Sequence, residues 1–405
     1  MKRFWLLPGS LFLGVALYAG CSSNAGGFSS SFDAGEAGPI DTSDGGPGLF
    51  DDASTTAAVN VTLTGVVYAP NGTLPLAGTL VYITDAQPDP IPQQTYCDKC
   101  ITIPAGTFVV SKADGTFSLP VKATTGKHFL VVQKGQFRRV RPFNVEKEGE
   151  LRFDKTFTSL PGKRDATLGD DVPKMVVLKG PSKFDKIEES LTKLGITEIE
   201  VQNSRDLVKN AAELQKYHVV FIPCDDRDNP QSATAETRQN LQAFVKSGGK
   251  LYVTDWSYEW VRQPFGGFLG FDGDQSFGQT TVSEYDGAGT VVDPGLKDWL
   301  TAVGETSFTL QGSYTRINYA NTLPGLDPDG KDTLITPKVW MNVDYNSKPY
   351  ASTVSFEQQC GRVLFSTYHT EGGFGGSGQF LAQEKALLYI LLEVTACAGE
   401  IGGPK

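Results

Sequence analysis

Histidine and positive charge are scarce in this sequence. It has 3 His among 405 residues, and 36 Lys and Arg stand against 46 Asp and Glu, which gives a net charge of −10. Three scattered histidines do not supply the closely spaced ligand pairs of a histidine-based zinc site. No cluster of basic residues interrupts the acidic surplus, so we expect no nucleic-acid partner.

The sequence also lacks an N-terminal apolar run long enough to span a membrane. Phe4 to Leu17 is apolar apart from Pro8 and Ser10, and it follows Lys2 and Arg3. This order predicts a secretory signal peptide over residues 1–20. The small residues before Cys21 resemble the lipobox of bacterial lipoproteins, and the resemblance implies that Cys21 is acylated. An ordinary signal peptide with an incidental cysteine is the alternative.

Large apolar side chains are nearly missing from residues 22–58, which consist mainly of Gly, Ser, Ala and Asp. Such a segment cannot bury enough apolar surface to offset its ordering entropy. We therefore interpret residues 21–58 as a disordered tether between the lipid and a folded part. The protein is predicted to be exported and anchored to a membrane through its lipid, at the outer membrane or the cell surface.

Cys97 and Cys100 have the CxxC spacing found in zinc sites, but the other cysteines supply no second pair at such a spacing. If Cys21 carries lipid, five remain, and an exported protein can form disulfides. We predict a small loop disulfide between Cys97 and Cys100, with a metal half-site or a redox centre as alternatives. A second disulfide, Cys360–Cys397, would join the last strand to the last helix and leave Cys224 free.

Residues 59–158 contain short alternating strands with turn signals between them, which predicts an all-β sandwich. The stretches PLAG before a strand and ADGTF at a turn resemble the carboxypeptidase regulatory-like, prealbumin-type domain. Such domains are usually spacers or binding modules, so the resemblance implies no catalysis in this part.

From residue 172 to 396, continuous apolar strands alternate with helical patterns, which predicts a flavodoxin-like α/β domain with a parallel sheet. Ser182 is expected to cap the first helix, with Asp185 as its capping-box partner. Residues 262–345 are rich in Gly, Asp and aromatic residues and are interpreted as an insertion. The whole chain is therefore predicted to be multidomain.

Three stretches of this second domain resemble the class I glutamine amidotransferase-like fold, in its trehalose-utilisation-protein-like branch. They are YHVVFIP, LQAFVKSGGKLYVTD and GRVLFSTYHTE followed by ALLYILLEV. In active members a Cys sits on a tight turn and is served by a His and a Glu two residues apart. The resemblance therefore implies catalytic positions at His369 and Glu371.

The nucleophile is missing where the resemblance places it. The turn after KLYVT reads Asp255-Trp256-Ser257, without the small residues that a strained turn favours. Ser257 or Cys224 could replace the missing sulfur, if either lies within hydrogen-bond reach of His369. The ordinary amidotransferase reaction is not expected, and His369 held only by packing is the alternative interpretation.

Side chains at the carboxyl ends of parallel strands face a common ligand-binding edge. Carboxylates beside aromatic rings suit sugars or cationic peptides. The predicted ligand-binding residues are Asp225, Asp226, Asp255, Trp256, Tyr258 and Trp260. Burial of the two Trp under the insertion is the competing interpretation.

A separate acidic turn, LDPDGKD, offers Asp327, Asp329 and Asp332 as ligands for Ca²⁺, although a plain polar turn is the alternative. No other cofactor is expected. Taken together, the sequence predicts a non-catalytic envelope lipoprotein that binds or scaffolds, with glycans, peptides or envelope proteins as partners. The alternative is a hydrolase that uses His369 and Glu371 with an unconventional nucleophile, or with a metal held by Asp225, Asp226, Asp255 and Glu371.

Overall fold

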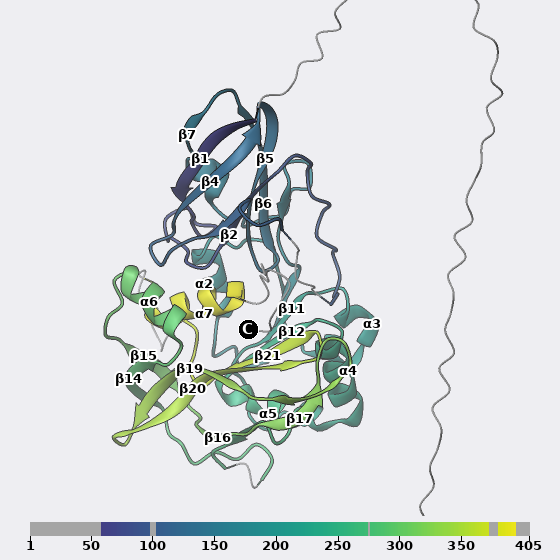
Figure 1. Ribbon diagram of the computed structural model, residues 1–405. Coiled ribbons are helices and arrows are strands. Elements are labelled where there is room, and N and C mark those ends of the chain that lie inside the picture. Colours follow the sequence, from purple (N-terminus) through teal and green to yellow (C-terminus); the bar gives the residue numbers. More distant parts are fainter. Residues whose placement is uncertain (1–57, 98–102, 274–275, 372–379, 394–405) are drawn as a thin grey trace, which may run out of the picture. The chain divides into compact units, whose positions relative to one another are not determined.

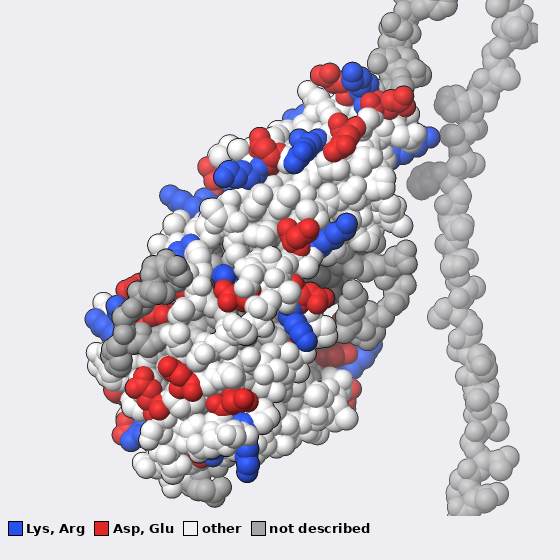
Figure 2. All heavy atoms as spheres, turned by 90° about the vertical axis from the view of Figure 1, so that its left-hand side faces the viewer, with Lys and Arg blue, Asp and Glu red and all other residues white. Residues whose placement is uncertain are grey.

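The computed structural model describes residues 58–97, 103–273, 276–371 and 380–393. They all belong to one compact unit that covers residues 55–405. Among these residues, no helix combines the length and the apolar character needed to cross a membrane. On the face shown in Figure 2, acidic and basic side chains are interspersed. Cys21, the signal peptide and the tether lie outside the described residues, except for Ala58, which begins a strand.

The first half of the chain forms two sheets that share a core. Their strands are β1 (Ala58–Val66), β4 (Thr116–Thr124) and β7 (Gly149–Arg152) in one sheet, and β3 (Phe108–Val110), β2 (Leu80–Thr84), β5 (Gly126–Lys134), β6 (Phe137–Val145) and β8 (Asp170–Asp171) in the other. Leu63 and Phe117 of the first sheet are buried in the same cluster as Val81 and Leu130 of the second. A short helix, α1 (Lys155–Thr158), lies between β7 and β8.

The second half is built on one nine-stranded sheet. Five parallel strands come in the order β10 (Ile199–Gln202), β9 (Met175–Leu178), β11 (Val219–Ile222), β12 (Lys250–Thr254) and β21 (Gly361–Ser366). Antiparallel strands then extend the sheet in the order β20 (Lys348–Gln358), β19 (Lys338–Tyr345), β14 (Tyr285–Val291) and β15 (Thr309–Ser313). The alternation of strand and helix predicted from the sequence over this region is present.

Helices cover both faces of this sheet (Figure 1). One core includes residues of α2 (Ile187–Lys193), α6 (Pro294–Ala302) and α7 (Ala382–Glu393). The other includes residues of α3 (Ala211–Leu214), α4 (Ala235–Lys246) and α5 (Glu259–Arg262). Met175 and Val177 of β9 belong to the first core, and Val176 and Leu178 to the second. A sheet buried on both faces explains why these strands are continuously apolar.

The segment predicted as an insertion contributes to the sheet itself. Of its strands, β14, β15 and β19 pair antiparallel at the edge beyond β20. The remaining strands form two small ribbons, β13 (Leu269–Phe271) with β16 (Ile317–Ala320) and β17 (Leu323–Leu326) with β18 (Asp332–Ile335). These added strands bring Glu284 and Tyr314 close to Cys224 and His369, at the carboxyl edge of the parallel strands.

The start of α2 differs from the prediction. The helix begins at Ile187, and its N-terminal cap is Lys186, whose side chain makes no capping hydrogen bond. Lys183 has a φ of +54°, which prevents a helix from starting at Ser182. The backbone N–H of Ser182 donates to the Asp225 carboxylate instead. Gly195, with φ +82°, ends the helix as expected.

The predicted disulfide pairs are wrong, because Cys97 is bonded to Cys360. A cysteine forms one disulfide at a time, which excludes both Cys97–Cys100 and Cys360–Cys397 in this structure. Cys100 and Cys397 lie outside the described residues. The observed bond ties a loop of the β-rich part to the turn between β20 and β21. Local spacing suggested the wrong partners because the true partners are 263 residues apart.

His218 connects the same two parts of the molecule. The Lys174 N–H donates to its Nδ1 at 2.8 Å, and its Nε2 lies 2.8 Å from the Pro92 carbonyl oxygen. Nδ1 is therefore the acceptor and Nε2–H the donor of a neutral ring. Burial, and secondarily the nearby Lys250 and Lys174, lower the pKa of His218 from 6.5 to about 4.

This histidine is expected to make the protein less stable in acid. The unfolded state takes up the proton first, so stability is full above about pH 6.5 and falls as pH drops toward 4. The full loss is about 3 kcal/mol. Urea unfolding across this range should show it. In His218→Gln the stability at neutral pH should be lower, but its decline with acid should be smaller. An equal decline in both proteins would contradict this assignment.

Candidate functional site

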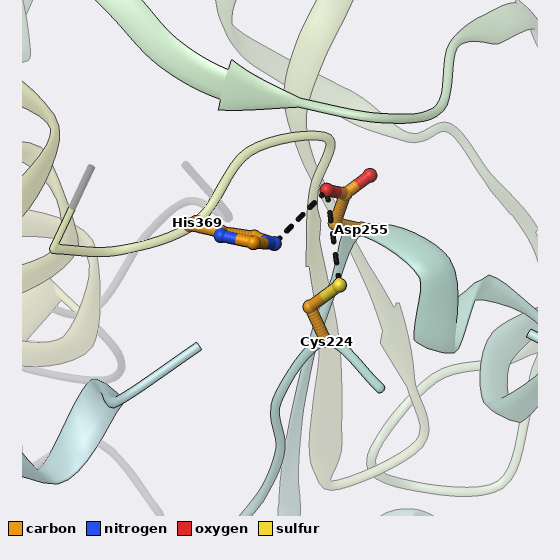
Figure 3. Close-up of side chains that lie close together, drawn as sticks. All are labelled: Cys224, Asp255 and His369. Carbon is orange, nitrogen blue, oxygen red and sulfur yellow. Dashed lines mark hydrogen bonds and ion pairs between the residues drawn. The ribbon is translucent and has the colours of Figure 1, made fainter. Parts of the chain in front are cut away.

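Three side chains converge at the carboxyl edge of the parallel strands. Cys224 follows β11, Asp255 follows β12 and His369 follows β21. Because β12 pairs in parallel with both β11 and β21, the carboxyl ends of these three strands lie side by side. Figure 3 shows the three side chains pointing toward one another. Of the residues considered from the sequence, the structure therefore brings together Asp255, His369 and Cys224, the last of which was one of the two candidates for a replacement nucleophile.

The three side chains are close and buried. His369 Nε2 lies 3.5 Å from Asp255 Oδ2, and Cys224 Sγ lies 3.9 Å from the same oxygen. One possible ligand atom from each residue lies within 4.8 Å of the others. Cys224 is 1% exposed, Asp255 is fully buried and His369 is 4% exposed. His369 Nε2 has no hydrogen-bond partner among the described residues. A buried nitrogen without a protein partner needs a water, an ion or a ligand group beside it.

Asp255 stands on a strained turn. Its φ is +46°, in the left-handed region that few side chains adopt, although Asp tolerates it better than most. The sequence-based objection to a strained turn here is therefore wrong. The Tyr314 N–H donates to the Asp255 carboxylate, at 3.0 and 3.1 Å from its two oxygens. Backbone strain of this kind clusters at active sites.

A cavity of about 270 Å³ opens beside these residues. Its lining residues are Phe184, Cys224, Trp256, Glu284, Tyr314 and His369. Trp256 packs edge-on against the rings of Phe184 and Tyr314 and donates its indole N–H to the Tyr314 carbonyl. The Tyr314 ring is stacked on the His369 ring, with centroids 5.1 Å apart. The predicted ligand contact of Trp256 thus lies at the cavity, which is walled mainly by aromatic rings.

Burial sets the charge state of the three central groups. It raises the pKa of the Cys224 thiol, and the nearby Asp255 raises it further. Burial also raises the pKa of Asp255, against the hydrogen bond from Tyr314. It lowers the pKa of His369, although Glu371 and Glu284 oppose that shift. Each group is thus held toward its neutral form, because ionisation in a poorly solvated place is costly without a counter-charge.

Glu371 does not serve His369 as predicted. Its carboxylate accepts the Lys186 N–H at 2.6 Å and shares a hydrogen bond with Asp185. Burial and the Asp185 charge raise the pKa of Glu371 to about 9, so one proton is shared between the two carboxyl groups. Asp185, expected only as a helix cap, is fully buried and accepts bonds from Thr254 Oγ1 and the Thr370 N–H. This pair supports the loops beneath the site.

The neighbouring acidic loop is structural. The buried Asp225 carboxylate accepts the N–H groups of Ser182, Lys183 and Asp226. A Cβ atom on Gly180 would lie 2.3 Å from the Cγ atom of Asp225, so only glycine fits beside this carboxylate. Asp226 accepts a hydrogen bond from the Ser182 hydroxyl. These contacts use the Asp225 carboxylate to hold the loop, whereas Asp226 is half-buried and accepts one side-chain hydrogen bond, so its assignment as a ligand-binding residue stays a prediction.

Two of the predicted aromatic ligand contacts belong to the core. Tyr258 is fully buried and its hydroxyl donates to the Gln279 carbonyl. Trp260 is 1% exposed and packs against the Arg205 guanidinium. The hydroxyl of Ser257 donates to the Pro223 carbonyl, so Ser257 does not replace the missing nucleophile. The interpretation of a Trp buried for packing thus holds for Trp260 and fails for Trp256.

The predicted calcium ligands do not converge. Asp327 Oδ1 accepts the N–H groups of Asp329 and Lys331, which makes an ordinary polar turn. Asp332 begins strand β18 and pairs with Leu326. Within the described ranges, the cluster of three or more metal-ligating side chains is Cys224, Asp255 and His369. The residues that line the cavity from the added strands, Glu284 and Tyr314, carry no sequence signal that could have identified them.

No family model matches this chain, and no curated protein matches it either. Among solved structures, a protein from Bacteroides uniformis described as ThuA-like is 10% identical over 55% of this chain and 92% of its own, with a TM-score of 0.36. A cytoplasmic protein of Salmonella typhimurium is 12% identical over 54% of this chain and 98% of its own, with a TM-score of 0.34. A GH42 β-galactosidase, Gan42B, is 11% identical; 56% of this chain and 31% of that enzyme are covered, with a TM-score of 0.30.

Proposed function

We propose that this protein is an exported, lipid-anchored hydrolase whose centre is Cys224, Asp255 and His369. The observation that carries the proposal is the convergence of these three buried side chains beside an aromatic cavity. The sequence alone favoured a non-catalytic binding protein, because the expected nucleophile was missing. A Cys within hydrogen-bond reach of His369 was the condition under which a catalytic role would gain weight. The structure does not meet it in full, because Cys224 and His369 offer atoms within 4.8 Å of each other but His369 Nε2 has no hydrogen-bond partner among the described residues.

The order of the parallel strands supports the location that we propose for the active centre. The parallel strands run in the order β10, β9, β11, β12 and β21, which is the 2-1-3-4-5 order of flavodoxin-like sheets. In such sheets ligands bind outside the carboxyl ends of the strands, where the cavity is found. We place the α/β part in the amidotransferase-like class on this order and on the sequence resemblance. The carboxypeptidase regulatory-like β-rich part, the tether and acylation at Cys21 are proposed from the sequence.

The cavity also restricts the substrate. At about 270 Å³ it accepts a small group, and its walls are the rings of Phe184, Trp256 and Tyr314. An apolar or sugar-like acyl or glycosyl group suits such walls better than a charged one. We therefore propose an ester or amide with a small uncharged acyl group, whose carbonyl carbon is attacked by an activated water.

The proposal is tested by assaying the purified protein against chromogenic esters and amides of graded acyl size. In His369→Gln the rate should fall by about 100-fold, since the imidazole is lost from the centre. His128→Gln is the matched control, because His128 is also buried but is bonded to Asp85 and the Thr124 carbonyl in the β-rich part. It should keep the wild-type rate. Equal rates in wild type and His369→Gln, with both folded, would reject the proposed function.

A further inference from the structure

The three central side chains place three possible metal-ligand atoms close together. Each offers one donor atom, a sulfur, a carboxylate oxygen and an imidazole nitrogen, and these atoms lie within 4.8 Å of one another. Catalytic zinc sites keep three protein ligands of these types and leave the fourth position to water or substrate. A tetrahedral zinc ion with ordinary bond lengths separates its ligand atoms by about 3.4 to 3.6 Å. The observed 3.5 Å for His369–Asp255 and 3.9 Å for Cys224–Asp255 approach these separations, and the Cys224 and His369 atoms lie within 4.8 Å of each other.

A second observation is independent of this clustering. His369 Nε2 is buried, has no hydrogen-bond partner among the described residues, and points at the Asp255 carboxylate. The ring is fixed in this direction by stacking on Tyr314. The backbone is also fixed, because the His369 N–H donates to the Gly312 carbonyl and Gln383 donates to the His369 carbonyl. A rigidly held imidazole with an unused nitrogen is what a metal ligand needs.

We propose that Cys224, Asp255 and His369 bind a divalent ion of the zinc class, with a fourth position open to the cavity. The thiolate and imidazole ligands favour Zn²⁺ over Mg²⁺ or Ca²⁺, which prefer oxygen. This inference rests on the proposed function for its chemical purpose, although metal binding can be measured without any substrate. It replaces the predicted acidic ligands Asp225, Asp226 and Glu371, whose carboxylates are engaged elsewhere.

The chemistry that follows uses one further cavity residue, Glu284. Its exposed carboxylate lies beside Tyr314, with which it shares a hydrogen bond. An ion held there would lower the pKa of a water in the fourth position and so supply the nucleophile. Glu284 would accept the proton that this water gives up as it adds to the substrate carbonyl carbon, and would return it to the leaving oxygen or nitrogen when the bond from that carbon breaks.

Cobalt provides a readout that does not depend on turnover. Protein stripped with a chelator should bind Co²⁺ at one ion per chain and develop thiolate-to-cobalt charge-transfer absorption together with the visible bands of a tetrahedral site. Cys224→Ser should lose the charge-transfer absorption, and His369→Asn should weaken binding by at least about 10- to 100-fold, because the loss of a ligand costs no less than the loss of its supporting partner. Cys100→Ser/Cys397→Ser, which leaves all three ligands in place, should behave like wild type. Circular dichroism should establish that each variant is folded.

The outcomes separate the metal site from the proposed function. Absence of stoichiometric binding in the wild type, or charge-transfer absorption that survives in Cys224→Ser, would overturn the metal site. Hydrolysis that persists after chelation with no metal in the protein would overturn it as well, while leaving the hydrolase proposal in place. Cobalt bound through Cys224 in a protein that cleaves no ester or amide would support the metal site and reject the proposed function.

Discussion

Loss of the Cys97–Cys360 disulfide is expected to lower the free energy of unfolding by about 3 to 5 kcal/mol. The bond joins residues 263 positions apart, so it closes most of the folded chain into one loop. Long loops lose the most conformational entropy when they are closed in the unfolded state. Both cysteines are partly exposed, so a reductant can reach them in the folded protein. Urea unfolding with and without reductant measures the difference directly.

The control for this experiment is the double variant Cys97→Ser/Cys360→Ser. It should match the reduced wild type and should not respond to reductant, whereas a single variant could allow Cys97 to pair with Cys100. His218 and Thr95 also connect the β-rich part to the α/β part, through Pro92 and Gln215. If these contacts alone fix the two parts, the double variant will differ from the oxidised wild type by less than about 1 kcal/mol, which would refute the prediction.

Much of the α/β architecture was predictable because its strands are buried on both faces. Continuous apolar runs such as VVFI at 219–222 and KLYVT at 250–254 are recognisable without their neighbours. Residue types also mark both ends of helix α4. Thr234 caps its start, and Gly248, which adopts a positive φ, follows its end. Local patterns of this kind report local structure, and the carboxyl edge of the sheet followed from the strand directions.

The site was only partly predictable, because it depends on contacts between residues that are far apart in the sequence. Cys224, Asp255 and His369 each follow a recognisable strand, so their shared edge could be inferred. Their separations could not, because they depend on loop conformations such as the positive φ of Asp255. Tyr314 and Glu284 reach the cavity because residues 262–345 extend the sheet, and no local pattern shows where such added strands will pair. The disulfide depends on contacts of the same long range.

Asp255→Asn is expected to abolish activity while it stabilises the metal-free protein. The carboxylate is fully buried, sits on a strained turn and has its pKa raised by burial. Asn has nearly the same shape, can still accept the Tyr314 N–H and tolerates a positive φ, but it carries no charge. Stability without metal should therefore rise by about 1 kcal/mol. The hydrolysis rate should fall on the order of 10³-fold, since the group that joins Cys224 and His369 is altered.

Asp185→Asn is the matched control, because Asp185 is equally buried at the same edge of the sheet but is well supplied with hydrogen bonds. Thr254, Thr370 and Glu371 all bond to its carboxyl group, so an amide there leaves a donor facing a donor. This variant should lose about 1 to 3 kcal/mol of stability. If Asp255→Asn raises the stability and Asp185→Asn lowers it, Asp255 is a residue retained for chemistry at a cost in stability. If Asp255→Asn destabilises the metal-free protein as much as Asp185→Asn and keeps its activity, Asp255 is a structural residue and the assigned centre is wrong.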